Sequence, residues 1–152
     1  MTQSDLSSYD WPVAAPFVAP YRAAAEDIDD FGHVNNLRYI AWSMDTAWRH
    51  SNALGLTMED YHRIGVGCVV WRHRFDYAAP VLEGDDVLIA TWIAKNDGRV
   101  RLTRAYEIRR VDTGVKVFSG ETVFVSVNMA NGKPAVMPKE FVDAYRPAVE
   151  NQ

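Results

Sequence analysis

The sequence contains few of the features that mark secreted, membrane-spanning or nucleic-acid-binding proteins. Cys68 is the only cysteine among 152 residues, so an internal disulfide cannot form and a reducing compartment is expected. No apolar run approaches the length of a membrane span, and residues 1–10 show neither the basic nor the apolar stretch of a signal peptide. The formal net charge is −4, without the basic excess that nucleic acid or an anionic membrane attracts. We therefore expect a cytoplasmic protein with no nucleic-acid or membrane partner.

Metal ligands and reactive thiols are sparse as well. No metal site is predicted, because no histidine stands at ligand spacing from carboxylates or from the cysteine; the four histidines are His33, His50, His62 and His73. Cys68 lacks the basic neighbours that activate a nucleophilic thiol, and packing is its expected role. The length fits a single domain over residues 1–152, and residues 1–16 are expected to form a loose N-terminal arm.

The clearest element that is present is an amphipathic helix over residues 36–54. Asn35 or Asn36 can cap its start, and Gly55 can close its end in a left-handed conformation. Asp45 and Arg49 stand four residues apart and can pair on its outer side. One mostly apolar stripe recurs at steps of three and four residues: Leu37, Ile40, Ala41, Met44, Ala47, Trp48, Ser51 and Leu54.

The apolar period elsewhere is two, which is typical of strands. Turn sequences such as Asn-Asp-Gly at residues 96–98 join neighbouring strands into hairpins. The expected strands cover residues 21–26, 69–77, 86–94, 99–111 and 115–127. One face of the second expected strand carries Val69, Trp71, His73, Phe75 and Tyr77.

This order of elements predicts an α+β protein. A run of antiparallel hairpins has to bury the apolar stripe of the helix, and a five-stranded antiparallel sheet wrapped around one long central helix is the hotdog fold. The strand over residues 86–94 is apolar on both faces, which indicates that the outer face of the sheet is also covered. A second subunit is the simplest cover, so we expect a homodimer or a dimer of dimers.

Three motifs in the sequence resemble the 4-hydroxybenzoyl-CoA thioesterase family. The most specific is Asp-Ile-Asp-Asp-Phe-Gly-His-Val-Asn-Asn at residues 27–36, followed by Tyr39 in the helix. Phe-Asp-Tyr at residues 75–77 precedes Pro80 and Gly-Asp at residues 84–85, and Glu-Ile-Arg-Arg at residues 107–110 precedes a turn. The resemblance implies an acyl-CoA thioesterase with the hotdog fold, active sites between two subunits of a homodimer, and no metal or organic cofactor.

The resemblance also assigns site residues. Asp29 falls on the family's catalytic carboxylate and Gly32 on the turn that opens the helix, with His33, Asn35 and Asn36 as further catalytic candidates. The sequence departs from the family at two positions, because Met44 stands where an acidic residue is common and Asn36 where some members have a histidine. The candidate substrate-binding residues are Val34, Tyr39, His73 and Arg104.

The chemistry of a thioester fits a carboxylate before a helix. Asp29 would act as general base or nucleophile, and the free N–H groups from His33 to Asn36 would polarise the carbonyl. The alternative is that the acidic residues only cap the turn and complement the helix dipole. The leading function is hydrolysis of an acyl-CoA thioester, and the other is a non-catalytic hotdog module that binds acyl-CoA or a partner protein.

Two polar residues lie on apolar strand faces. His73, between Trp71 and Phe75, is expected to be a core histidine with a satisfied hydrogen bond. Arg104 is in phase with inward residues of its strand, where the family has an apolar side chain, and needs a partner. Pairing with Glu121 on the next strand is the favoured interpretation; recognition of a polar or anionic acyl group is the other.

Overall fold

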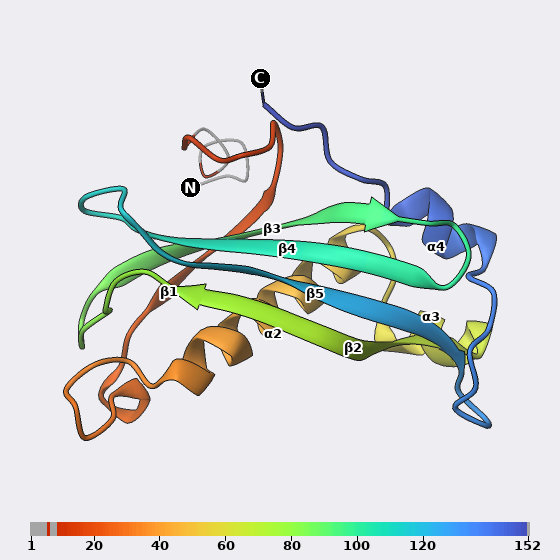
Figure 1. Ribbon diagram of the computed structural model, residues 1–152, viewed down its shortest axis with the longest axis horizontal. Helices are drawn as coiled ribbons and strands as arrows, with labels where there is room; N and C mark the ends of the chain where they lie inside the picture. Colours follow the sequence, from red (N-terminus) through yellow and green to blue (C-terminus); the bar gives the residue numbers. More distant parts are fainter. Residues whose placement is uncertain (1–5, 7–8, 152) are drawn as a thin grey trace.

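The structure, a computed structural model, describes residue 6 and residues 9–151 (Figure 1). In this part of the chain no helix is both long enough and apolar enough to cross a membrane. The elements in chain order are β1 (Phe17–Arg22), η1 (Ala25–Asp27), α2 (Asn36–Ala53), α3 (Met58–Ile64), β2 (Val66–Tyr77), β3 (Asp86–Asn96), β4 (Arg101–Arg110), β5 (Lys116–Asn128) and α4 (Lys139–Ala144).

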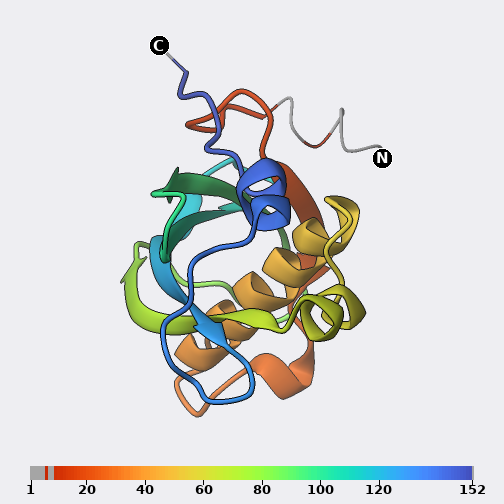
Figure 2. The ribbon, with the colours of Figure 1, turned by 90° about the vertical axis from the view of Figure 1, so that its right-hand side faces the viewer.

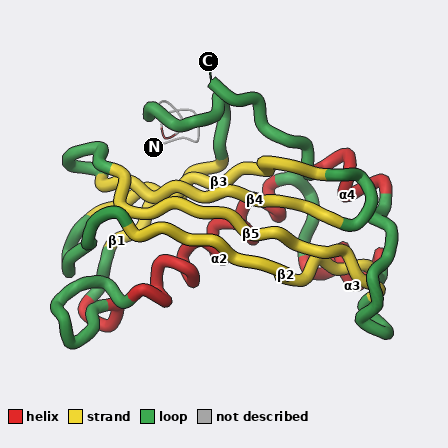
Figure 3. The backbone as a smooth tube through the Cα atoms, viewed as in Figure 1, coloured by secondary structure: helices red, strands yellow, loops and turns green. Residues whose placement is uncertain are grey.

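The five strands form one antiparallel sheet in the order β1-β3-β4-β5-β2. Figure 2 shows this sheet curving around α2, and Figure 3 shows the strands as one layer in front of the helix. The predicted α+β hotdog fold is therefore confirmed. Strands β1 and β2 are the two edges of the sheet.

Helix α2 forms where the sequence predicts it. The side chain of Asn35 accepts a hydrogen bond from the N–H of Leu37 at 2.9 Å, Gly55 adopts a φ of +87°, and Asp45 pairs with Arg49 at 3.1 Å. The buried face differs from the predicted stripe, because Leu37 remains 65% exposed and the buried side chains are Tyr39, Trp42, Ser43, Thr46, Ala47 and Ser51. Of the predicted stripe, Met44, Ala47, Trp48 and Ser51 line a cavity between α2 and the sheet, whereas Ala41 and Leu54 are exposed.

The first strand starts four residues earlier than predicted. Strand β1 covers Phe17–Arg22, and the predicted end of the strand forms the short 3-10 helix η1 instead. Pro20 lies inside β1, which is tolerated because β1 is an edge strand and Pro20 lacks only an N–H.

The segment before β1 is packed, in contrast to the loose arm expected for residues 1–16. Trp11 is 1% exposed, and its indole N–H donates to the carbonyl oxygen of Leu6 at 3.1 Å. Leu6 and Trp11 pack with Leu88 and Ala90 on the outer face of β3. The chain itself therefore covers the apolar outer face for which the sequence predicted a second subunit. Residues 1–5 and 7–8 of this arm lie outside the described residues.

Strand β2 contains a bulge that the two-residue period does not reveal. The pairing with β5 skips Trp71, so the side chains before and after this residue change faces. His73, Phe75 and Tyr77 share the helix side with Tyr106 and Phe118, whereas Val69 lies on the outer side. The predicted single face from Val69 to Tyr77 is therefore wrong.

Helix α4 was not predicted from the sequence. The chain after β5 crosses the end of the sheet near α3, as Figure 1 shows. Phe141 and Tyr145 are buried there against Tyr61 of α3. This segment closes one end of the space between α2 and the sheet.

Candidate functional site

The predicted catalytic carboxylate lies in a tight turn between η1 and α2. The N–H of Asp29 donates to the carbonyl oxygen of His33 at 2.9 Å, and the N–H of Gly32 donates to the carbonyl oxygen of Asp29 at 3.0 Å. One carboxylate oxygen of Asp29 accepts the N–H of Phe31 at 2.9 Å, and its other oxygen has no hydrogen bond within the described chain. Gly32 has a φ of +80°, a left-handed conformation that glycine adopts easily and that residues with a side chain disfavour. The sequence therefore places a half-buried carboxylate with one free oxygen before α2.

A second aspartate, Asp27, holds this turn in place. Its carboxylate accepts the Nε–H of Arg38 at 2.7 Å and the backbone N–H of Ala24 at 2.9 Å. Its carbonyl oxygen accepts the N–H of Asn35 at 2.8 Å. The Asp27 side chain is only 6% exposed. Asp27 is thus a structural residue, and it differs in this from Asp29 two positions later.

Only some of the backbone N–H groups before α2 remain available for a ligand. Val34 donates to the carbonyl oxygen of Val81 at 2.8 Å, and Asn35 donates to Asp27. The N–H groups of His33 and Asn36 form no hydrogen bond within the described chain. The prediction of free N–H groups from His33 to Asn36 is therefore correct for two of the four residues.

The turn is joined to the hydrophobic core through Val34 and Tyr39. Val34 is 4% exposed, and Tyr39 is 3% exposed and stacks on Phe118 with ring centroids 5.5 Å apart. The Tyr39 hydroxyl accepts the N–H of Val81 at 3.2 Å, and the hydroxyl of Tyr77 donates to the carbonyl oxygen of Asn36 at 2.9 Å. Within one chain, Val34 and Tyr39 therefore have core positions, and their contact with substrate stays a prediction.

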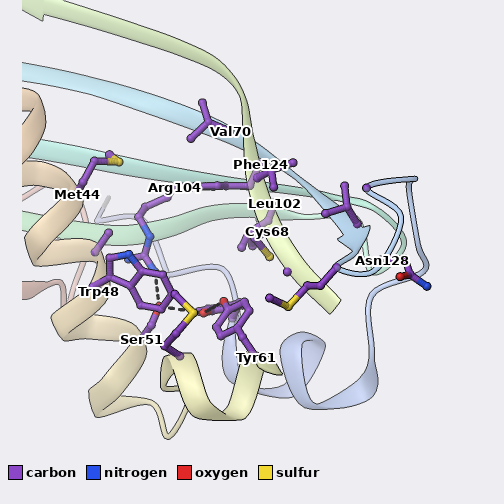
Figure 4. A pocket seen from close by; sticks show the side chains of 18 residues that line it. Met44, Trp48, Ser51, Tyr61, Cys68, Val70, Leu102, Arg104, Phe124 and Asn128 are labelled. Carbon is purple, nitrogen blue, oxygen red and sulfur yellow. Dashed lines mark hydrogen bonds between the residues drawn. The ribbon is translucent and has the colours of Figure 1, made fainter. Parts of the chain in front are cut away.

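A cavity of about 560 Å³ lies farther along α2. Figure 4 shows it between α2, α3 and the sheet, with Met44 and Trp48 on the helix side and Phe124 on the sheet side. Asn36 and Ser51 lie about 22 Å apart along the helix at 1.5 Å per residue. The Asp29 turn and the deep end of this cavity therefore belong to opposite ends of α2.

Arg104 lies at the deep end of the cavity and is 2% exposed. Its Nη1 donates to Nδ1 of His50 at 2.8 Å and to Oγ1 of Thr91 at 3.1 Å, and its Nη2 approaches Oγ of Ser51 at 3.5 Å. The predicted pair with Glu121 is wrong. Arg104 is opposite Thr122, whereas Glu121 is opposite Ala105 and lies on the other face of the sheet.

Neutral hydroxyl and thiol groups surround Arg104. The hydroxyl of Tyr145 is hydrogen-bonded to Oγ of Ser51 at 2.9 Å and also to the hydroxyl of Tyr61. Burial raises the pKa of both tyrosines and raises the pKa of the Cys68 thiol to about 11. Sequence reasoning missed this cluster because its members come from separate elements and no local motif connects them.

His73 and Arg104 lie in one row across the helix side of the sheet. Both are opposite Thr122 of β5, which separates them, and Nδ1 of His73 is within hydrogen-bond distance of its hydroxyl at 2.7 Å. His73 thus has the expected polar partner, but it lies on the edge strand β2 and is exposed instead of belonging to the core. The structure does not bring His73 or Arg104 to the Asp29 turn.

The described residues include no group of three or more histidine, cysteine, aspartate or glutamate side chains that could hold a metal ion. The charged groups of interest are therefore the Asp29 carboxylate and the Arg104 guanidinium. Asp45, the acidic residue next to the family position at Met44, points to the side of β1, where its carboxylate accepts the hydroxyl of Tyr21 at 2.5 Å.

Comparison with known proteins assigns the class. The model of the Thioesterase-like superfamily matches residues 23–145, and the chain therefore belongs to this superfamily. This confirms the thioesterase resemblance carried by the motif at residues 27–36. No curated protein matches the chain significantly.

Solved structures share the fold at low sequence identity. A 1,4-dihydroxy-2-naphthoyl-CoA thioesterase from Synechocystis has a TM-score of 0.76 and 18% identity over 84% of this chain and 93% of its own. A DHNA-CoA thioesterase from Staphylococcus aureus has a TM-score of 0.75 and 22% identity over 84% and 87%. A hypothetical protein from Staphylococcus aureus, solved in complex with CoA, has a TM-score of 0.80 and 17% identity over 90% and 89%.

Proposed function

We propose that the protein hydrolyses an acyl-CoA thioester to a free carboxylic acid and CoA, with Asp29 as general base or nucleophile. The observation that carries this proposal is the Asp29 carboxylate oxygen that has no partner among the described residues, in the turn before α2 that also holds two N–H groups without an acceptor among them. Membership in the Thioesterase-like superfamily supports the reaction class. The CoA-bound and thioesterase neighbours share the fold and are consistent with a CoA ester as substrate.

The general-base form of the reaction uses groups of this chain alone. Asp29 accepts a proton from water while the water oxygen bonds to the thioester carbonyl carbon. The N–H groups of His33 and Asn36 donate to the oxyanion that forms, where the start of α2 also favours negative charge. The carbon–sulfur bond then breaks, and the proton returns to the CoA thiolate. In the nucleophilic form, Asp29 attacks the carbonyl carbon, the carbon–sulfur bond breaks and the CoA thiolate leaves. Water then hydrolyses the mixed anhydride, which releases the acid, restores Asp29 and supplies the proton that the thiolate takes up.

We further propose that the complete site forms between two subunits. Strand β2 is an edge of the sheet, and Val69, Val70 and Trp71 near its middle are each about half exposed, at 48%, 48% and 49%. Two such strands can pair antiparallel around a two-fold axis. A pairing centred on β2 would place the cavity of each protomer beside the Asp29 turn of its partner, although the two lie at opposite ends of α2 within one chain.

The second candidate function is a non-catalytic module that binds acyl-CoA or a partner protein. The observation in its favour is that one oxygen of Asp29 already accepts the N–H of Phe31, as a purely structural turn aspartate would. Both candidate functions are compatible with the cytoplasmic location that the sequence predicts.

The test is steady-state hydrolysis of a panel of acyl-CoAs, followed with a thiol-trapping reagent, and paired with direct acyl-CoA binding measurements. Turnover of at least one acyl-CoA is expected. Binding without turnover across the panel would favour the non-catalytic module. Sedimentation of the protein at micromolar concentration is expected to show dimers or larger assemblies, and a monomer alone would contradict the shared site.

A further inference from the structure

Arg104 is a buried cation whose charge no carboxylate of the described chain neutralises. It is 2% exposed, and no ion pair connects it to any described aspartate or glutamate. A buried charge without a counter-ion is destabilising. An arginine in such a position therefore points to a role in binding or catalysis.

The neighbours of Arg104 do not supply the missing negative charge. Burial and the positive charge of Arg104 lower the pKa of His50 to about 4, so its ring is neutral at physiological pH and can accept the Nη1–H. The raised pKa of the Cys68 thiol, about 11, keeps this group protonated, and burial keeps Tyr61 and Tyr145 protonated as well. The cluster is therefore rich in donors and carries a net positive charge.

One edge of the guanidinium remains available. Arginine has five N–H donors, and the two on Nη1 are occupied by His50 and Thr91. The opposite edge, formed by Nε and Nη2, makes only the long 3.5 Å contact with Ser51 within the described chain. Two parallel N–H groups on one edge match the two oxygens of a carboxylate.

The cavity defines the rest of the ligand. Arg104 is its only charged lining residue among the described residues, and most of the others are apolar side chains, which come from both α2 and α3 and from strands β2, β4 and β5 (Figure 4). A ligand that fills it therefore needs an apolar body and one anionic end group.

We propose that this cavity binds an acyl group that carries a carboxylate at the end distant from the thioester, and that the Nε–Nη2 edge of Arg104 binds this carboxylate. The substrate class is thus the CoA monothioesters of dicarboxylic acids. A neutral acyl chain of the same length would fill the cavity but leave Arg104 without a counter-ion, which disfavours it. The carboxylate site rests on the geometry around Arg104, and only its connection to a thioester rests on the proposed function.

A binding experiment tests the carboxylate site without any turnover. The probes are octanoate and octanamide, which share the alkyl chain and differ in charge, measured by calorimetry and by the shift in melting temperature. Wild-type protein is expected to bind octanoate at least about tenfold more tightly, as a hydrogen-bonded charge pair predicts. Arg104→Met is expected to lose this preference. Arg104→Lys is expected to keep part of it, because lysine keeps the positive charge but lacks the two parallel N–H donors of the Nε–Nη2 edge.

Arg101→Met is the matched control, because Arg101 lies on the same strand but is exposed and stacks over Trp71 at 4.5 Å, outside the cavity. This variant is expected to keep the full preference for octanoate. Equal binding of the two probes by wild-type protein would overturn the carboxylate site. The same conclusion would follow if Arg104→Lys and Arg104→Met both kept the preference.

The second arm measures hydrolysis of CoA monothioesters of linear dicarboxylic acids against monocarboxylic acyl-CoAs of equal length. Wild-type kcat/KM is expected to favour the dicarboxylic series at least about tenfold at the best length, and Arg104→Met to lose this ratio while neutral acyl-CoAs are still hydrolysed. Hydrolysis without any preference would overturn the substrate class alone. Arg104-dependent binding of octanoate without hydrolysis of any thioester would support the carboxylate site and overturn the proposed function.

Discussion

The turn before α2 and the deep end of the cavity are built in opposite ways. In the turn, residues close in sequence bond to one another, as Asp29 does with Phe31 and His33. At the deep end of the cavity, Arg104 meets His50 and Ser51 from α2 and lies near Tyr145 after α4, so the contacts join residues far apart in sequence. The turn is acidic and open to solvent, whereas the cavity end is cationic and closed.

This difference separates two tasks that one substrate would require. A carboxylate that takes a proton from water works best where water and a thioester can reach it, and Asp29 has a free oxygen in such a place. A guanidinium that recognises an anion is most selective where water is excluded, and Arg104 is in such a place. Variants at the two ends of α2 test whether chemistry and recognition divide in this way.

The largest effect is expected for Asp29→Asn. Asparagine can still accept the N–H of Phe31, but it cannot take a proton from water or attack a carbonyl, so kcat should fall by about 10²–10⁴-fold with an almost unchanged melting temperature. Asp30→Asn, an exposed neighbour in the same turn, is the matched control and should retain activity. If Asp29→Asn kept more than about a third of the wild-type kcat, the catalytic assignment would be wrong.

Asp27→Asn should affect stability instead of chemistry. The buried Asp27 carboxylate holds both Arg38 and the N–H of Ala24, so its loss is expected to reduce the free energy of unfolding by about 1–3 kcal/mol. Turnover per folded molecule should change far less than in Asp29→Asn. Chemical denaturation and steady-state kinetics on both variants would measure the contrast, and equal losses of kcat would remove the distinction between the two aspartates.

A pH effect is expected at the cavity end through His50. Its folded-state pKa is lowered from 6.5 to about 4, so the unfolded chain binds this proton first as the pH falls. The stability that depends on neutral His50 is complete above about pH 6.5 and declines toward pH 4, with a loss of about 1 kcal/mol by pH 5.5. Urea titrations of the wild type and His50→Gln should show this decline only in the wild type. Identical pH profiles would contradict the buried neutral imidazole.

The smallest effect is expected between Arg104 and Glu121. The two side chains lie on opposite faces of the sheet and share no partner, so a double-mutant cycle of Arg104→Met and Glu121→Leu should give a coupling of less than about 0.5 kcal/mol. Arg104→Met alone leaves no carboxylate without its partner. The free energy of unfolding of this variant should therefore match or exceed that of the wild type. A coupling of several kcal/mol would restore the ion pair that the sequence pattern favoured.

Most of the fold followed from local patterns. The helix over residues 36–54 and the hairpin at residues 96–98 were predicted because capping residues, glycine turns and apolar periods are properties of neighbouring residues. Two errors arose where a pattern was interrupted. The bulge at Trp71 reversed the faces of β2, and the expected pair with Arg104 placed Glu121 on the wrong face of the sheet.

The candidate site also has one part that local sequence predicts and one part that it does not. The sequence by itself determined the turn around Asp29, because its geometry depends on a carboxylate, a glycine and an N-cap within the seven residues 29–35. Only the tertiary structure decided the role of Arg104. Its partners at residues 50, 51 and 91 come from α2 and β3. The register between β4 and β5 places Glu121 on the opposite face of the sheet from Arg104. Strand register and long-range packing are set by the whole core, and a linear pattern of residues does not contain them.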